Sequence, residues 1–148
     1  MRIVSSPVYL DTSALAKLYV PEPGSDALES ALLGRRDLLV SDLAATEFTS
    51  AVSRRLREGD LSARDARRIY TRLRGDLSRG EYQRLELTGA VHRDAERILL
   101  SLGRTIALRA LDALHLALAS GSAAGAFVSF DRTQLAAARA LGTFDLPV

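Results

Sequence analysis

Short apolar runs alternate along this chain with longer segments of helical periodicity, and this alternation restricts the fold more than any other feature. The strand-like runs are Val8–Asp11, Leu38–Ser41, Tyr82–Thr88 and Ala126–Asp131, with residues 143–148 a candidate for a last one. Strands that are separated by helices favour the α/β class with a parallel sheet. We therefore predict a three-layer α/β/α fold with a central, mainly parallel sheet.

Apolar residues between these runs recur at helical spacing. The predicted helices cover Ala14–Tyr19, Ser25–Leu33, Asp42–Glu58, a segment that opens at Ser62, Val91–Leu102, Leu108–Ala119 and Thr133–Leu141. Ser25 and Asp42 are the predicted N-caps of their helices, and Gly59 is expected to end the third. No linker, repeat or low-complexity tract divides the chain, so we expect a single domain over residues 1–148.

The composition excludes several classes of protein. Hydrophobic residues make up 47% and charged residues 26%, which is typical of a globular chain and argues against disorder. There is no cysteine, so disulfides and thiolate metal sites are excluded. No apolar run approaches the roughly 20 residues of a membrane span, and the N-terminus lacks the apolar region of a signal peptide. We expect a soluble, cytoplasmic protein with no membrane partner.

Arginine dominates the basic residues, since Lys17 is the single lysine and the net charge is only +2. The segment Arg54–Arg84 holds ten arginines against five acids, a surplus of five. These arginines could contact RNA, because phosphate contacts supply most sequence-independent affinity. A solvated helical hairpin explains the same pattern, so both interpretations remain open.

Two acids end strand-like runs whose other residues are apolar. Asp11 follows Val8–Leu10, and Asp131 closes the run that begins at Ala126. The carboxyl ends of parallel strands form the crevice in which open α/β sheets bind their ligands. A capping or turn role is the alternative for each acid.

Two further acids lie in helical segments with apolar neighbours. Between Ala110 and Ala119 only Asp112 and His115 are polar, so this helix should be buried, and no cap or exposed face explains the aspartate. Glu47 is the only charged residue from Leu43 to Val52 and borders the inward stripe. A glutamate that reaches solvent or an arginine is the alternative for this position.

A shared metal ion would explain why four such acids occur together. An ionised carboxylate in apolar surroundings is costly unless it is paired or binds a metal. Two carboxylates 4 Å apart repel by about 4 kcal/mol at an effective dielectric constant near 20. Oxygen ligands without cysteine select a hard divalent cation, which predicts Mg²⁺, with Mn²⁺ as a substitute.

The stretches around the four acids resemble the acidic motifs of the PIN-domain ribonucleases, particularly the VapC-type toxins of type II toxin–antitoxin pairs. They read "VYLDTSALAKLY", "SDLAATEFTSAV", "LRALDALHLALA" and "FVSFDRTQLAAA", in the family's order and at its spacing. The resemblance covers nearly the whole chain, and Ser129 stands where many relatives have threonine. It implies a PIN fold, a Mg²⁺- or Mn²⁺-dependent endoribonuclease that leaves a 5′-phosphate, inhibition by a cognate antitoxin, and a homodimer.

The resemblance also implies roles for individual residues. Asp11 and Asp112 would bind the metal directly, while Glu47 and Asp131 would hold its waters or a second ion, so one or two ions remain open. The candidates for substrate binding are Thr12, Ser13, Arg109 and Ser129. Plain N-capping is the alternative for the first two, and a surface salt bridge is the alternative for the arginine. His115 is favoured as a hydrogen-bonded core residue over a general base.

Other functions were weighed against the same residues. A haloacid-dehalogenase-type phosphotransferase needs an acid where this chain has Ser13, and a response-regulator receiver needs a lysine after a later strand. Ser13 excludes the first, and the second is excluded because Lys17 is the only lysine. A housekeeping RNA-processing nuclease and a non-catalytic protein-binding module remain as alternatives.

Overall fold

A four-stranded parallel sheet forms the centre of the computed structural model, which describes residues 1–148. Its strands are β1 (Val8–Leu10), β2 (Leu38–Ser41), β3 (Gln83–Leu85) and β4 (Ala126–Val128), in the order β3-β2-β1-β4. All residues of β1, β2 and β4 are buried, as continuous apolar strands covered on both faces should be. The mostly exposed β3 lies at one edge of the sheet.

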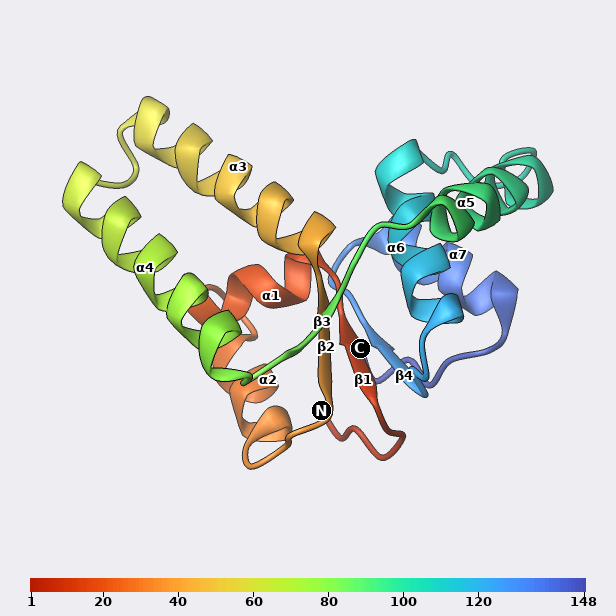
Figure 1. Cartoon of the computed structure of the whole chain (residues 1–148), viewed down its shortest axis with the longest axis horizontal. Helices are drawn as coiled ribbons and strands as arrows, with labels where there is room; N and C mark the ends of the chain where they lie inside the picture. Colours follow the sequence, from red (N-terminus) through yellow and green to blue (C-terminus); the bar gives the residue numbers. More distant parts are fainter.

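Helices cover both faces of the sheet. They are α1 (Thr12–Tyr19), α2 (Ser25–Leu32), α3 (Asp42–Glu58), α4 (Ala63–Arg79), α5 (Gly89–Leu102), α6 (Ala110–Gly121) and α7 (Arg132–Leu141). Figure 1 shows α1 to α4 on one side of the sheet and α5 to α7 on the other. The predicted three-layer α/β/α architecture is therefore confirmed.

The period-2 alternation of β1 divides the core into its two halves. Val8 and Leu10 pack into the cluster formed with α1, α2, α3 and α4. Tyr9 points to the opposite face, where it packs with Phe127 and with residues of α6 and α7. The rings of Tyr9 and Phe127 stack with centroids 5.4 Å apart. The central strand thus fixes both helical layers.

Two of the predicted helix caps are wrong. Gly24, in the left-handed region with φ 93°, precedes α2, while the Ser25 hydroxyl accepts a hydrogen bond from the Glu22 N–H instead. Ser41 caps α3 because its hydroxyl accepts from the Ala44 N–H at 3.0 Å, and Asp42 is the first helical residue. The predicted end of α3 is confirmed.

Several elements are shorter than predicted, and the C-terminal run is not a full strand. The first and fourth strands end at Leu10 and Val128, before the acids that follow them. The segment after α7 makes a single parallel bridge, in which Asp145 lies beside Ala126 at the β4 edge. None of the helices combines the length and the apolar character that crossing a membrane requires.

Candidate functional site

The strand order places a topological switch point at β1. The chain runs from β1 to β2 and then β3 on one side, whereas β4 pairs with the other side of β1. Ligands of open α/β sheets bind outside the carboxyl ends of the strands at such a point. Asp11 directly follows β1, and Asp131 follows β4 after two residues.

A cavity of about 460 Å³ brings all four predicted acids together. Its walls carry Asp11, Glu47, Asp112 and Asp131, from the starts of α1, α6 and α7 and from the middle of α3. Thr12, Ser13, Arg109 and His115 also line it, whereas Ser129 is fully buried behind the wall. Acids separated by up to 120 positions in the chain therefore face one space.

Asp11 is the most deeply buried of the four acids, with 3% of its surface exposed. Its Oδ1 caps α1 by accepting the Ala14 N–H at 2.9 Å, and it also accepts from the Ser13 hydroxyl at 2.6 Å. Burial raises the pKa of the Asp11 carboxyl, and hydrogen bonding with the Ser129 side chain, with Ser13 and with the Ala14 N–H offsets the rise only in part. The cap predicted as an alternative is therefore present. The same carboxyl also lines the cavity, where burial opposes its ionisation.

Glu47 is held by side chains from two other helices. Its Oε1 accepts the Thr12 hydroxyl at 2.8 Å and lies 2.6 Å from His115 Nε2. Although burial raises the pKa of Glu47, the hydrogen bonds from His115 and Thr12 outweigh that effect and lower it. Glu47 is therefore fixed in its charged form.

His115 connects Glu47 to the core of the sheet. It is 3% exposed, and its Nδ1 lies 2.7 Å from the hydroxyl of Tyr9 on β1. A carboxylate can only accept, so a neutral ring carries its proton on Nε2 and takes the Tyr9 proton at Nδ1. The prediction of a buried, hydrogen-bonded histidine is confirmed.

The local position of Asp112 differs from the prediction. We expected a mid-helix aspartate without a cap, but α6 begins at Ala110, so Asp112 lies in its first turn. Its Oδ2 accepts the Arg109 N–H at 3.0 Å, and its side chain is 14% exposed. The reason is that the chain is still extended at Arg109, so the helix begins two residues after its predicted start at Leu108.

Asp131 is held in a similar way at the start of α7. Its Oδ1 accepts the Gln134 N–H at 2.9 Å, while its own N–H donates to Ser129 at 3.0 Å. The Ser13 hydroxyl accepts the Phe130 N–H at 2.8 Å, which ties the end of β4 to α1. The contacts of Ser13 and Ser129 thus support the acids, and their binding of substrate stays a prediction.

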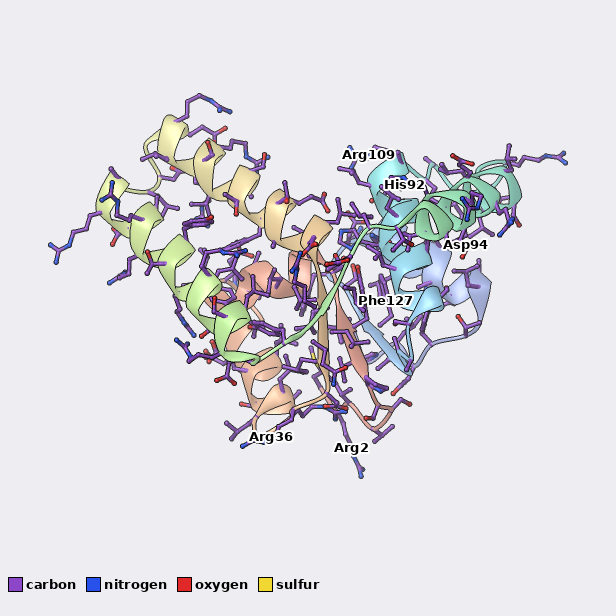
Figure 2. The ribbon with its side chains drawn as sticks, in the orientation of Figure 1. Arg2, Arg36, His92, Asp94, Arg109 and Phe127 are labelled. Atoms are coloured by element: carbon purple, nitrogen blue, oxygen red, sulfur yellow. The ribbon has the colours of Figure 1, made fainter.

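Three arginines line the cavity beside the acids. Arg109 is 85% exposed and lies 3.9 Å from Asp112, so the predicted salt bridge is long and solvated. Figure 2 shows Arg109 at the end of the molecule opposite Arg2 and Arg36. Arg54 and Arg55 of α3 also line the cavity. Glu22, Glu58 and Asp60 line it as well, and Arg55 lies 3.8 Å from Glu22, so the outer wall of the cavity carries both signs of charge.

The carboxylate oxygens that face the cavity suit a hard cation, although they are not close enough together to form a complete coordination shell. No group of three or more acid or histidine side chains converges closely enough to hold an ion as it stands. Glu47, Asp112 and Asp131 each use one oxygen within the protein and leave the second without a hydrogen bond there. These oxygens, together with the Asp11 carboxylate, fit a hydrated divalent ion better than a fully dehydrated one.

Two residues of this site were not anticipated from the sequence. The Tyr9 hydroxyl hydrogen-bonds to His115 Nδ1. A tyrosine within an apolar strand shows in the sequence only which face of the sheet it occupies, not that it supports a functional site. Gln134 lines the cavity and is 2% exposed. Its position three residues after Asp131 is the signal that could have found it, since that spacing returns to the same helix face.

Comparisons with known proteins agree with this geometry. Residues 8–140 match the family model described as PIN domain. The chain is 35% identical over 137 residues to ribonuclease VapC46 of Mycobacterium tuberculosis, covering 91% of this chain and 92% of that protein.

Solved structures show the same fold at low sequence identity. VapC20 of Mycobacterium tuberculosis, described as a sarcin-ricin loop cleaving toxin, has a TM-score of 0.69 at 16% identity, over 88% of this chain and 95% of that one. A toxin–antitoxin complex from Klebsiella pneumoniae has a TM-score of 0.62 at 15% identity, over 88% and 91%. With most of its length matched in sequence and in fold, the chain belongs to the PIN-domain family.

Proposed function

We propose that this protein is the endoribonuclease toxin of a type II toxin–antitoxin pair and cleaves RNA phosphodiesters with the help of Mg²⁺. The observation that carries the proposal is the cavity at the switch point, which collects acids from four separate helices. Similarity to a protein named as a ribonuclease supports RNA as the substrate. Mn²⁺ is expected to substitute for Mg²⁺, because both are hard ions with oxygen ligands.

The four acids would have two different roles in holding the ion. Asp11 and Asp112 would hold the ion directly, and the free oxygens of Glu47 and Asp131 would accept from its waters or hold a second ion. When bound, a divalent ion lowers the pKa of a coordinated water and offsets negative charge on the phosphate. Thr12 and His115 keep Glu47 in place, so its free oxygen has a fixed position in the cavity.

The arginines of the cavity wall would bind the substrate. The Arg109 guanidinium is exposed beside Asp112, where it can meet a phosphate oxygen without leaving a buried acid unpaired. Attack of water on phosphorus with loss of the 3′-oxygen leaves a 5′-phosphate and a 3′-hydroxyl. No covalent bond to the protein forms, because water is the attacking group.

The proposed partners are a cognate antitoxin and a second copy of the chain. Similarity in fold to a toxin–antitoxin complex supports the first. The second rests on the family resemblance.

A nuclease assay with matched variants tests the activity. Wild type should cleave single-stranded RNA in Mg²⁺, leave 5′-phosphate ends and lose activity in EDTA. Asp11→Asn should reduce the rate by at least about 100-fold, because it removes a direct ligand of the ion. Asp94→Asn is the control, since Asp94 pairs with Arg97 on α5, outside the cavity (Figure 2).

Equal cleavage by wild type and Asp11→Asn, or cleavage that persists in EDTA, would contradict the proposed site. The toxin role is tested separately by inducing each protein in growing cells. Wild type should arrest growth, whereas Asp11→Asn should not. A housekeeping RNA-processing nuclease, the alternative role, would cleave RNA in vitro without arresting growth.

A further inference from the structure

Gln134 is a buried polar side chain in the wall of the four-acid cavity. It lies in the first turn of α7, on the face that also buries Ala137 and Ala138. Only 2% of its surface is exposed, although the other buried residues of this helix are alanines. A long amide at such a position has to find hydrogen-bond partners or remain unsatisfied.

The carboxamide oxygen of Gln134 has no partner within the protein. A residue three positions after an N-cap usually accepts the N–H of the capping residue. Here the Asp131 N–H donates to the Ser129 hydroxyl instead, at 3.0 Å. Gln134 hydrogen-bonds to Asp131 through its backbone N–H, not through its carboxamide. The local donor that would satisfy the oxygen is therefore already used.

The chemistry of the cavity indicates what could donate to this oxygen. The free atoms of the four acids are acceptors, and so are the oxygens of a phosphodiester. A hydrated divalent cation instead presents O–H donors in several directions. A neutral carboxamide adds an acceptor for such water without adding to the repulsion among four carboxylates.

We propose that the Gln134 carboxamide oxygen accepts a hydrogen bond from a water of the divalent cation bound beside Asp11 and Asp112. This inference rests on the proposed metal dependence and adds a fifth, uncharged member to the site. Gln134 positions the hydrated ion and does not itself touch the scissile bond. Its unsatisfied oxygen destabilises the free protein and is satisfied when the ion binds.

The test combines metal titration with melting of the metal-free protein. Gln134→Met keeps the length of the side chain but removes the acceptor. It should weaken Mg²⁺ and Mn²⁺ binding by about tenfold in calorimetry, as loss of an outer-sphere contact typically does. In EDTA its melting temperature should equal or exceed that of wild type. Gln134→Glu, which keeps an acceptor, should bind both ions at least as tightly as wild type.

Gln83→Met is the matched control, since Gln83 is the other glutamine and lies exposed on β3. It should leave metal affinity unchanged. Unchanged affinity in Gln134→Met would overturn the inference, and so would a loss of affinity accompanied by a lower melting temperature in EDTA. A defect confined to RNA cleavage at saturating metal would also overturn it and indicate a substrate contact instead. If wild type binds no divalent ion, the proposed metal dependence fails together with the inference.

Discussion

Asp11 is at once the N-cap of α1 and a buried charge at the cavity. The cap uses one oxygen, which an asparagine could supply equally well. The negative charge is not needed for the helix, and burial raises the pKa of the carboxyl above its usual value. Ionisation of this carboxyl therefore carries a cost in the metal-free protein, as expected for a group that serves a ligand.

Asp11→Asn should change how the stability of the metal-free protein depends on pH. A carboxyl whose pKa is higher in the folded state stabilises the fold below its unfolded pKa, near 4, and loses this contribution as pH rises through the folded pKa. The variant lacks this loss and keeps the cap. In EDTA at pH 8 it should melt about 2–4 °C above wild type, and the difference should shrink towards pH 4.

Thermal melts followed by circular dichroism at several pH values measure this effect. Asp94→Asn serves again as the control, since its side chain is 44% exposed and pairs on the surface. Parallel pH profiles for wild type and Asp11→Asn would show that the buried charge carries no such cost.

At the scale of helices and strands, the arginines of the α3–α4 hairpin fall into two groups by position. Arg54 lines the cavity, whereas Arg67 is exposed on α4 outside it, and neither makes an ion pair. The hairpin predicted as one interpretation of the arginine-rich segment is present (Figure 1). Contact with RNA would then belong to the arginines of the cavity wall and not to the whole segment.

Arg54→Gln should weaken RNA binding and reduce its dependence on salt. Each lost phosphate contact lowers the slope of log affinity against log salt by about one. Fluorescence anisotropy between 50 and 200 mM salt measures the slope, with both substitutions made in the Asp11→Asn background so that the RNA stays intact. Arg67→Gln is the control and should leave the slope unchanged. An equal effect of both substitutions would instead assign binding to the net charge of the hairpin.

The same elements show how far the sequence predicts the site. Asp11 and Asp131 could be assigned to one edge because parallel strands share the position of their carboxyl ends. Asp112 was misjudged because a shift of two residues in the start of α6 moves it from mid-helix to the first turn. The contact of Thr12 with Glu47 could not be predicted, since it depends on how α1 packs against α3. Hydrogen-bond partners such as those of His115 on β1 and α3 depend on distances between elements, which periodicity does not contain.

The whole molecule has a functional end and a structural end. Arg109 marks the cavity end, and Arg36 lies at the opposite one (Figure 2). Next to Arg36, the Arg35 guanidinium donates to the carbonyls of Ile3 and Ser5, both at 3.1 Å, and to Asp37 at 2.7 Å. This contact ties the N-terminal segment to the start of β2, far from the acids. Distant groups without shared partners should contribute independently to stability and activity.

Arg35→Met should therefore lower stability without affecting RNA cleavage. The hydrogen bond from Arg35 lowers the pKa of Asp37 in the folded protein. The pair therefore stabilises the fold fully above the unfolded pKa of Asp37, near 4. This contribution is lost as the pH falls through the lower pKa of the folded state. Both side chains are partly exposed, so the loss at pH 7 should be about 1 kcal/mol, or about 2–4 °C in melting temperature. Below pH 4 the two proteins should converge.

Arg36→Met, on the exposed neighbour, should match wild type throughout. A fall in cleavage rate with Arg35→Met would show that the two ends are coupled. A stability difference that persists unchanged at pH 2 would assign the loss to the hydrogen bonds with the Ile3 and Ser5 carbonyls instead of the Asp37 pair.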